Sequence, residues 1–395
     1  MNKTAEVVVI GGGVIGSSVA YYLAKKGLKV IVIEKNQGLC FGASGANLAG
    51  LVIQNFESPL LEFVRESIKM YGNLSEEIGY NIEYERLGCL LVIDDEDQYP
   101  NAVKHVESMR IKGINVQLLE GNEIRKLEPV LGEDLIAGME DWEGGMVNPF
   151  KVTYGFARAA AKLGTSFLLS TEVRKIETNK KEKIISVDTD WGKIETDFVV
   201  NAAGAWASEI GEMLGISIPI RPLRGQAIVT EPVPLNERWR CIGDPPSHWA
   251  KPSSPKTAEK TKDSVVRLGG RTVIRQESTG NWLIGTSQEL AYNNRVTMET
   301  IRRHAKGAMR FIPKLKDVNC IRAYAGLRSH CYVDDLPILG KVDSPSGFVL
   351  ATGHSGEGLM LAPLTGKLIS ELITENRTSM PINAFSFSRF KKLNQ

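Results

Sequence analysis

The sequence predicts an α/β protein: a Rossmann-type dinucleotide-binding domain with an inserted α+β domain built on an antiparallel sheet. Three observations support this fold class. The apolar run Val7–Ile10 leads into a glycine turn, and a second run, Val30–Ile33, ends in an acid. Apolar segments that finish in small residues return at 197–204 and 348–353. Strand-rich sequence separates these pieces, which indicates that the second domain is inserted in parts.

The glycine turn has the pattern G-x-G-x-x-G, at Gly11, Gly13 and Gly16. Gly11 permits the tight bend, Gly13 lets a pyrophosphate approach the backbone, and Gly16 lets helix and strand pack closely. The helix that follows, expected over 17–27, offers free N–H groups to phosphates. Glu34 is placed to accept hydrogen bonds from ribose hydroxyls. The turn alone leaves NAD and FAD open, and a turn that merely packs tightly is the alternative.

Composition limits the function classes. The length of 395 residues suggests two domains, and 48 Lys and Arg against 46 acids give no basic field for nucleic acid. Five scattered cysteines show no metal-site spacing, so we expect no metal and idle thiols in a reducing compartment. No transmembrane helix is expected, and the immediate first strand leaves no room for a signal peptide. We therefore expect a cytoplasmic protein, with attachment to the membrane periphery left open.

The remaining pattern predicts an alternation of cofactor and substrate segments. Helices are expected at 59–79, 96–112, 150–163, 206–214, 297–311 and 364–373. Strands are expected within 84–93, 114–119, 166–170, 184–196, 225–231, 265–275 and 282–286. The cofactor domain is predicted to comprise 1–80, 144–224 and 320–395, and the substrate domain 81–143 and 225–319. The Pro-, Lys- and Ser-rich stretch 245–263 is expected to be a surface loop.

Several short motifs in a fixed order carry a family resemblance. They are Gly42–Leu51, Gly144–Pro149, Asn201–Trp206, Arg224–Gln226, Ala325–Gly340 and Gly353–Pro363. The chain resembles the D-amino-acid-oxidase-like FAD oxidoreductases, in the glycine oxidase and sarcosine oxidase branch. It is most similar to FAD subunits of opine and D-hydroxyproline dehydrogenases. The resemblance implies a Rossmann-type FAD-binding domain and FAD that is not covalently bound, because the family's attachment site matches a position near Leu327, which is no cysteine.

The resemblance also implies which residues contact FAD. Beyond the three glycines, they follow the cofactor from the pyrophosphate and ribose to the ring. They are Val14, Ile15, Glu34, Lys35, Gly42, Ala43, Ser44, Asn47, Leu48, Ala49, Gly50, Leu51, Val173, Ala203, Gly204, Trp206, Gly353, His354, Gly356, Gly358, Leu359 and Met360.

The implied chemistry is oxidation of a CH–NH bond by hydride transfer to the flavin, which gives an imine. Arg328 matches the family arginine that anchors a carboxylate, because a guanidinium suits bidentate binding. His354 is expected beside the flavin or the substrate, with a buried, satisfied histidine as the alternative. Arg275 and Gln276 lie on a predicted strand of the substrate domain, and one of their two faces is expected to meet the substrate.

The chain departs from its relatives at the expected substrate contacts. Glycine oxidases carry an arginine where Gly356 and Glu357 stand, and sarcosine oxidases carry a lysine where Met360 stands. Val273 takes the place of a tyrosine, and Ser329 that of a proline. These differences predict a different substrate contact and leave the choice among small amines and amino acids open.

Three other functions remain as alternatives. The first is the catalytic FAD subunit of a hetero-oligomeric amino-acid, opine or hydroxyproline dehydrogenase, which passes electrons to a partner. The glycine turn and Glu34 alone also fit an NAD-dependent dehydrogenase. A flavin-binding scaffold without catalysis is the last alternative.

Overall fold

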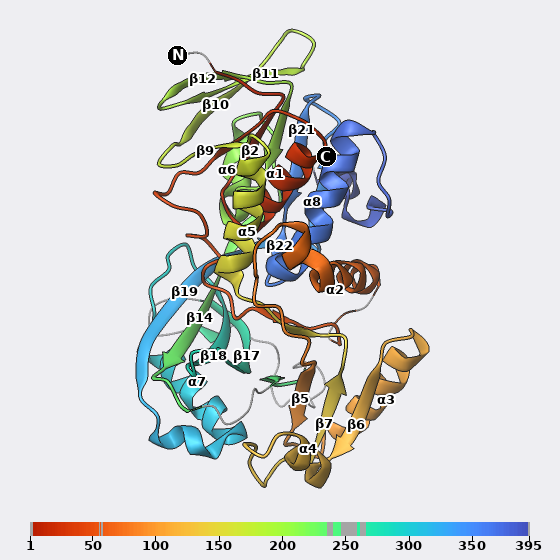
Figure 1. The fold of residues 1–395 in the computed structure, drawn as a ribbon, viewed down its shortest axis with the longest axis vertical. Helices are drawn as coiled ribbons and strands as arrows, with labels where there is room; N and C mark the ends of the chain where they lie inside the picture. The colour runs from red at the N-terminus through yellow and green to blue at the C-terminus, as the bar shows by residue number, and fades with distance from the viewer. Residues whose placement is uncertain are drawn as a thin grey trace.

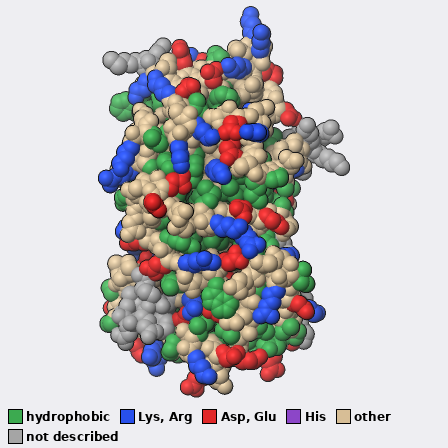
Figure 2. Space-filling view, turned by 45° about the vertical axis from the view of Figure 1, so that its right-hand side comes forward, with side chains coloured by type: hydrophobic (Ala, Val, Ile, Leu, Met, Phe, Trp, Pro, Cys, Tyr) green, Lys and Arg blue, Asp and Glu red, His purple; other side chains and the backbone are tan. Residues whose placement is uncertain are grey.

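The computed structural model describes residues 3–54, 56, 58–234, 240–245, 259–260 and 266–393. Most of the stretch 245–263, expected to be a surface loop, lies outside the described residues. None of the described helices is long and apolar enough to cross a membrane. Figure 2 shows acidic and basic side chains interspersed over one face, in keeping with the near-balance of charge.

A six-stranded sheet forms the upper half of the molecule (Figure 1). Its order is β20-β21-β13-β2-β3-β9, and all neighbours are parallel except β20 and β21. The strands are β2 (Val7–Ile10), β3 (Val30–Ile33), β9 (Ser166–Leu168), β13 (Phe198–Asn201), β20 (Ile338–Lys341) and β21 (Phe348–Thr352). The apolar segments that the sequence assigns to the Rossmann-type domain therefore lie in one sheet, as β2, β3, β13 and β21. The predicted fold class is confirmed.

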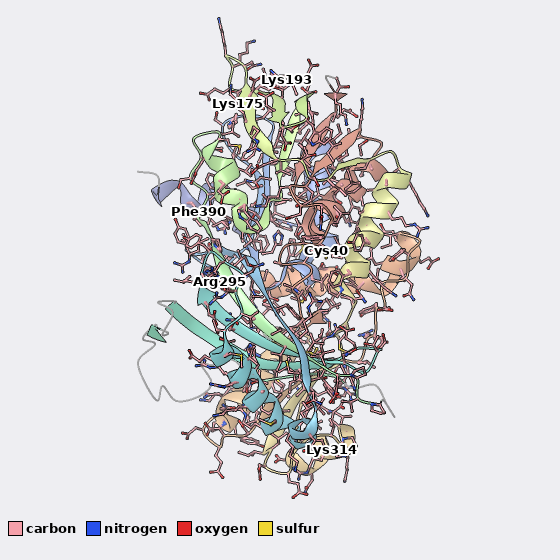
Figure 3. The ribbon with its side chains drawn as sticks, turned by 90° about the vertical axis from the view of Figure 1, so that its left-hand side faces the viewer. Cys40, Lys175, Lys193, Arg295, Lys314 and Phe390 are labelled. Atoms are coloured by element: carbon pink, nitrogen blue, oxygen red, sulfur yellow. The ribbon has the colours of Figure 1, made fainter. Side chains whose placement is uncertain are left out.

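Alternate residues of β2 pack to opposite sides of this sheet. Val7 and Val9 join the core under the helices, whereas Val8 and Ile10 join the core under a small four-stranded sheet. The helices are α1 (Val14–Lys25), α2 (Leu60–Glu77), α5 (Pro149–Lys162) and α8 (Gly358–Thr374), with α6 (Ala207–Glu212) on the other side. The small sheet has the order β1-β12-β11-β10 and holds Lys175 and Lys193 at the top of Figure 3. Its strands are β1 (Lys3–Thr4), β10 (Val173–Thr178), β11 (Ile184–Thr189) and β12 (Gly192–Glu195).

A ten-stranded, mostly antiparallel sheet forms the lower half of the molecule (Figure 1). Its order is β22-β19-β14-β18-β17-β15-β5-β7-β6, with β16 paired to β17. The strands are β5 (Cys89–Ile93), β6 (Val116–Glu120), β7 (Ala137–Asp141), β14 (Ile220–Thr230), β15 (Cys241–Gly243), β16 (Glu259–Lys260), β17 (Val266–Gln276), β18 (Trp282–Leu290), β19 (Cys320–Cys331) and β22 (His354–Ser355). The helices of this half are α3 (Tyr99–Ile111), α4 (Gly121–Leu127) and α7 (Met298–Phe311).

One face of the large sheet packs on α7, through Ile228, Ile274 and Ile284 among others. The opposite face of these central strands is left to line a cavity. A two-stranded sheet of β4 (Gly50–Leu51) and β8 (Gly145–Met146) connects the halves. Short 3-10 turns complete the described chain, at Gly204–Trp206, Pro313–Asp317, Asn383–Phe385 and Phe387–Leu393.

The elements differ from the sequence expectations in three places. The two strands expected within 84–93 reduce to β5, preceded by a single bridge from Glu85 to Met146. Helix α8 begins at Gly358 rather than at 364, and Pro363 lies inside it as its sixth residue. The Leu359 carbonyl, for which Pro363 has no N–H, accepts a hydrogen bond from the Tyr71 hydroxyl instead. Strand β19 belongs to the large sheet, whereas the predicted boundaries grouped 320–395 with the cofactor segments. The domain boundaries themselves stay a prediction.

Candidate functional site

A cavity of about 380 Å³ lies between the glycine turn and the free face of the large sheet. Its wall includes residues that end β2 and β13 of the six-stranded sheet, and residues of β14, β17, β18 and β19 of the large sheet. Open α/β sheets bind their ligands outside the carboxyl ends of the strands, and this cavity has that position. Its size falls in the range of small-molecule sites.

The glycine turn leaves no room for side chains. Gly11 has φ +111, and a Cβ on it would lie 2.4 Å from the carbonyl oxygen of Ala202. A Cβ on Gly16 would lie 1.9 Å from the carbonyl oxygen of Gly11. Gly11 donates its N–H to the Ile33 carbonyl at 2.8 Å, which fixes the turn against β3. The close packing predicted for Gly11 and Gly16 is therefore seen, and α1 begins at the cavity wall.

Glu34 is held on the wall by donors from both sides. Its Oε2 accepts the N–H of Gly12 at 2.7 Å, and its Oε1 accepts the N–H and Nδ2 of Asn36 at 2.8 and 2.7 Å. The carboxylate is largely buried yet lines the cavity. Its Oε2 accepts one hydrogen bond and can accept another, so the group is positioned for a polyol such as ribose.

Lys35 and Trp206 both line the cavity, and the Lys35 ammonium lies 3.7 Å from the centroid of the Trp206 indole ring. This cation–π contact brings together two residues that are far apart in the sequence. Val173 lines the same end, as do Thr171, Glu172, Glu209, Ile210 and Met213, which the sequence reasoning missed. An apolar and aromatic wall of this kind suits a flat heterocycle.

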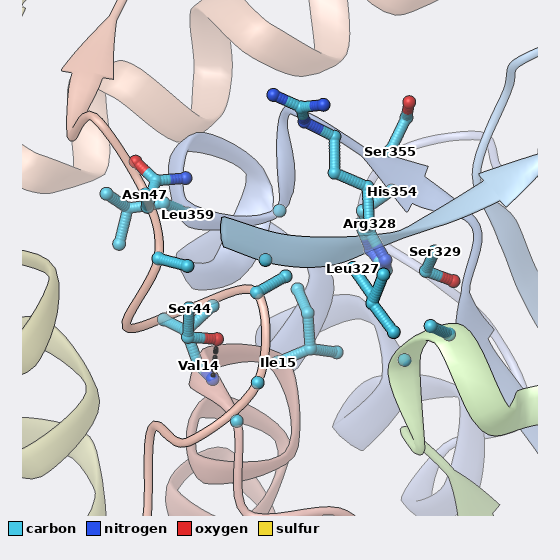
Figure 4. A pocket seen from close by; sticks show the side chains of 18 of the residues that line it. Val14, Ile15, Ser44, Asn47, Leu327, Arg328, Ser329, His354, Ser355 and Leu359 are labelled. Atoms are coloured by element: carbon cyan, nitrogen blue, oxygen red, sulfur yellow. Dashed lines mark hydrogen bonds between the residues drawn. The ribbon is translucent and has the colours of Figure 1, made fainter. Parts of the chain in front are cut away.

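The segment that follows β3 crosses the middle of the cavity. Ser44 accepts the N–H of Val14 on its Oγ at 3.0 Å, so the segment is tied to the first turn of α1 (Figure 4). Cys40 anchors the same segment on α5, with its Sγ 3.4 Å from Thr153 Oγ1; Figure 3 shows it in the middle of the molecule. A Cβ on Gly42 would meet nothing within 4 Å, which leaves open space above this segment.

A second loop reaches the cavity from the C-terminal side and ends at the start of α8. Gly356, Gly358 and Leu359 line the cavity there. His354 is buried, and its Nε2 lies 3.1 Å from Thr365 Oγ1 on α8. Burial lowers the pKa of His354 to about 3, so its imidazole stays neutral. His354 thus fits the expected alternative of a satisfied, buried histidine and not a group that exchanges protons.

Arg328 projects from β19 into this region, on the opposite side of the strand from Leu327 (Figure 4). Its Nη1 donates to the Ser287 carbonyl at 2.9 Å and its Nη2 donates to Thr286 Oγ1. Burial lowers the pKa of the guanidinium. These two bonds fix the guanidinium and leave its other N–H donors for an anion in the cavity.

A buried polar network supports the wall behind Arg328. Arg224 and Gln226 of β14 point toward the α7 side of the sheet. There Glu289 of β18 accepts hydrogen bonds from Arg224 Nε at 2.8 Å and from Gln226 Nε2 at 2.9 Å. Between them, Gly225 faces the cavity, and a Cβ on it would lie 2.3 Å from Arg328 Nη2. The Arg-Gly-Gln motif therefore has a physical reason. Its arginine and glutamine join β14 to β18 through Glu289, and its glycine leaves space for the Arg328 guanidinium.

The family model that describes FAD-dependent oxidoreductases, named DAO, matches residues 6–372. The chain belongs to this family. The similar solved structures include glycine oxidase from Geobacillus kaustophilus, with 27% identity over 98% of this chain and 99% of that chain and a TM-score of 0.87. L-proline dehydrogenase from P. horikoshii has 28% identity over 99% of both chains and a TM-score of 0.86. Among curated proteins, hydrogen cyanide synthase subunit HcnC of Pseudomonas aeruginosa is 28% identical over 99% of this chain and 97% of its own length.

This membership decides between the two dinucleotides that the glycine turn left open. DAO family proteins are FAD-dependent, so the NAD-dependent alternative is set aside. The cavity of this chain fits FAD: the start of α1 offers backbone N–H groups, Glu34 is fixed for a ribose, and Gly42 and Gly204 border open space. Among the described residues, Cys241 is the one cysteine in the wall.

Most of the predicted cofactor residues of this family member line the cavity. They are Gly11, Gly13, Val14, Ile15, Glu34, Lys35, Gly42, Ala43, Ser44, Asn47, Leu48, Ala49, Gly50, Val173, Ala203, Gly204, Trp206, His354, Gly356, Gly358 and Leu359. Four others lie just behind the wall. Gly16 packs on Gly11, Leu51 is in β4, Gly353 donates its N–H to Ser329 Oγ at 3.0 Å, and the Met360 carbonyl accepts from Ser67 at 2.7 Å.

The predicted substrate residues Arg275 and Gln276 are corrected by the structure, because neither lines the cavity. Arg275 donates to the Val147 carbonyl at 3.1 Å and pairs with Glu277. Gln276 donates to the Gly280 carbonyl at 3.0 Å and closes the β17–β18 turn. Arg275 Nε and Gln276 Oε1 have no hydrogen-bond partner among the described residues, but both side chains are buried away from the cavity wall and so do not meet a ligand there.

Other residues of the large sheet take their place in the wall. The sequence reasoning did not assign Arg271, Thr286, Gln288 and Glu357 to the site, although all four line the cavity. Cys241 also lines it and lies opposite Cys89 on the paired strands β15 and β5. The contact with Cys241, together with burial, holds the pKa of the Cys89 thiol well above its usual value, so that thiol is unreactive. All five cysteines are free, and Cys320 is the exposed one.

Proposed function

We propose that the chain oxidises the CH–NH bond of a small amino acid or secondary amine that carries a carboxylate. The observation that carries this proposal is Arg328, whose guanidinium is fixed on the cavity wall by Ser287 and Thr286 with donors left over. An arginine fork binds a carboxylate in two-point fashion and so orients the neighbouring carbon. The similarity to a glycine oxidase and an L-proline dehydrogenase supports an amino acid as the substrate.

The cofactor contacts follow from the wall residues. We assign the N–H groups at the start of α1 to the pyrophosphate, Glu34 to the ribose, and Trp206 and Val173 to the adenine end. The segment Gly42–Gly50 and the loop that ends at Gly358 border the ring system. FAD bound there supplies the acceptor for a hydride from the carbon that bears the amine.

The chain itself supplies orientation and a partly apolar enclosure. Arg328 holds the carboxylate, and the wall around it includes Leu48, Ala227, Val273 and Leu327. Apolar surroundings disfavour a charged amine and so favour the neutral form, whose lone pair assists cleavage of the neighbouring C–H bond. Arg328 and its two partners therefore set the position of the reacting carbon.

A second proposal concerns partners. We infer that the chain acts as the FAD subunit of a larger assembly, because the relative HcnC is named as a subunit of hydrogen cyanide synthase and spans the same length. In this case electrons leave through a partner rather than through oxygen. Co-purification of electron-transfer subunits would support the assembly, whereas vigorous peroxide formation by the isolated chain would contradict it. A cytoplasmic location stays part of this proposal.

An anaerobic screen tests the function directly. The purified protein is expected to be yellow, with an absorbance band near ~450 nm as for any oxidised flavin. Anaerobic addition of amino acids, N-methyl amino acids and cyclic imino acids is expected to bleach this band for at least one carboxylate-bearing amine. A colourless protein that takes up no FAD, or a flavin that no amine bleaches, would end the proposal.

Gly225→Ala tests the carboxylate anchor without touching Arg328. The new Cβ would lie 2.3–2.5 Å from the guanidinium atoms, and the guanidinium is the movable end of a flexible side chain. We expect FAD to be retained and the apparent affinity for the carboxylate substrate to fall about tenfold, the equivalent of one displaced charged contact. Gly72→Ala is the matched control, because nothing lies within 4 Å of its Cβ. Equal substrate affinity in both variants would argue against Arg328 as the anchor.

A further inference from the structure

Glu357 is a charged group of the cavity that the proposed function leaves unused. It lies between β22 and α8, at the N-cap of α8, but its side chain makes no capping hydrogen bond. Its side chain faces the cavity instead. Within the described residues, no hydrogen bond or ion pair engages its carboxylate. A half-buried carboxylate that faces a cavity and has no partner is positioned to bind a ligand there.

Charged groups from two strands of the large sheet and from a loop act on Glu357. Arg271 of β17 and Arg328 of β19 each lower the pKa of its carboxyl, and Asp335, just after β19, raises it. Burial outweighs the arginines and raises the pKa of Glu357 to about 7. The group therefore changes between acid and carboxylate near neutral pH, as a proton acceptor must.

The other acids near Arg328 are already engaged or point outward. Glu289 accepts hydrogen bonds from Arg224 and Gln226 behind the wall. Asp335 is exposed and binds His330 Nδ1 at 3.0 Å. The remaining acids of the wall, Glu34, Glu172 and Glu209, lie with the residues of the ribose and adenine end. In the described part of the cavity, Glu357 is thus the acid available to a group held next to Arg328.

The chemistry of an amino acid fits this pair of groups. Its amine and its carboxylate are attached to the same carbon, so the residues that bind them must lie side by side. Arg328 and Glu357 meet this condition, since both line the cavity and a Cβ on Gly356, the residue before Glu357, would lie 3.7 Å from Arg328 Nε. An anion and a cation on one wall match a zwitterion better than they match a simple carboxylate.

We propose that Glu357 binds the ammonium group of the substrate and accepts its proton. An N–H bond of the ammonium breaks and an O–H bond forms on the carboxylate, which leaves a neutral amine and a carboxylic acid. The neutral amine is the form from which the proposed function removes a hydride. This inference rests on the proposed function and adds the residue that prepares the substrate for it.

The pH dependence of anaerobic flavin bleaching tests the proton transfer. In the unmodified enzyme the rate is expected to rise as the pH passes about 7, because Glu357 accepts a proton only as a carboxylate. Glu357→Gln should lose this inflection, slow the step roughly 10²- to 10⁴-fold at neutral pH, and recover only as the free amine forms in solution. Glu357→Asp should keep an inflection, and so should the control Asp335→Asn.

A binding measurement separates recognition of the amine from turnover. 2-Aminoisobutyrate has no hydrogen on its α-carbon and cannot be oxidised, and isobutyrate lacks the amine. Titrated against the flavin spectrum, the unmodified enzyme should prefer 2-aminoisobutyrate roughly tenfold, and Glu357→Gln should lose that preference while still binding isobutyrate. An unchanged preference and an unchanged pH profile in Glu357→Gln would overturn the proposal for Glu357. A flavin that no amine bleaches in the unmodified enzyme would instead overturn the proposed function.

Discussion

Gly11→Ala is expected to give a protein that retains little or no FAD. The new Cβ would lie 2.4 Å from the Ala202 oxygen and 2.9 Å from the Ala202 carbon, which are backbone atoms. That backbone cannot retreat, because β13 is paired with β2 over its whole length. The glycine turn must therefore move instead, and this movement displaces the start of α1 from the cavity. The ratio of flavin absorbance to protein absorbance after purification measures the loss.

Gly27→Ala separates the clash from backbone strain. Gly27 also has a positive φ, of +86, but nothing lies within 4 Å of its Cβ. A left-handed alanine costs about 1–2 kcal/mol, so Gly27→Ala should unfold more easily by that amount, and Gly11→Ala by more because the clash adds to the strain. Only Gly11→Ala should also lose flavin. If Gly27→Ala lost flavin to the same extent, general destabilisation and not the turn would explain the result.

The parts of the site that depend on local sequence could be predicted. The requirement for glycine at positions 11 and 16 follows from a strand, a tight turn and a helix within one short segment, and the structure shows the expected contacts. The same holds for Glu34, which ends the next parallel strand and so lies beside the turn. Arg328 came from a family motif, and the structure gives that motif a mechanism through Ser287 and Thr286.

The substrate end could not be predicted, because it depends on which strands pair. Alternation along β17 separates its residues into two faces but does not say which face meets the cavity or where. The pairing of β17 with β18 is also irregular between Gly270 and Val273. As a result Arg271 lines the cavity, whereas Arg275 is used to bind Val147 and Glu277. Only the folded sheet distinguishes these two arginines.

The roles of Gly225 and Glu357 could not be predicted from the sequence either, because both depend on contacts between distant strands. The motif around Gly225 was noted, but the reason for its glycine appears only when β14 lies against β19 and brings Arg328 over it. Glu357 was noted as a departure from glycine oxidases. Its two facing arginines come from β17 and β19, far away in the sequence, so its electrostatic setting had no local signal.

Arg328→Leu is expected to abolish the preference for carboxylate-bearing amines while FAD stays bound. Loss of one partner of an enclosed charge pair costs about 3 kcal/mol, which is roughly a hundredfold in the bleaching rate at low substrate concentration. Leucine keeps much of the apolar stem but leaves Ser287 and Thr286 without their donor. The affinity for isobutyrate, followed through the flavin spectrum, should fall by a similar factor.

Arg328→Lys is the matched comparison, because it keeps the charge and removes the fork. A lysine presents a point charge, cannot donate to both Thr286 and Ser287 while facing a carboxylate, and should restore only part of the affinity. An amine without a carboxylate provides the substrate control: its weak oxidation should change far less in either variant. Since we propose that Arg328 binds the carboxylate and Glu357 the amine, the two losses should differ in kind. Arg328→Leu should lower affinity and keep an inflection, moved above pH 7 because Arg328 lowers the pKa of Glu357, whereas an unchanged affinity would place the carboxylate elsewhere in the cavity.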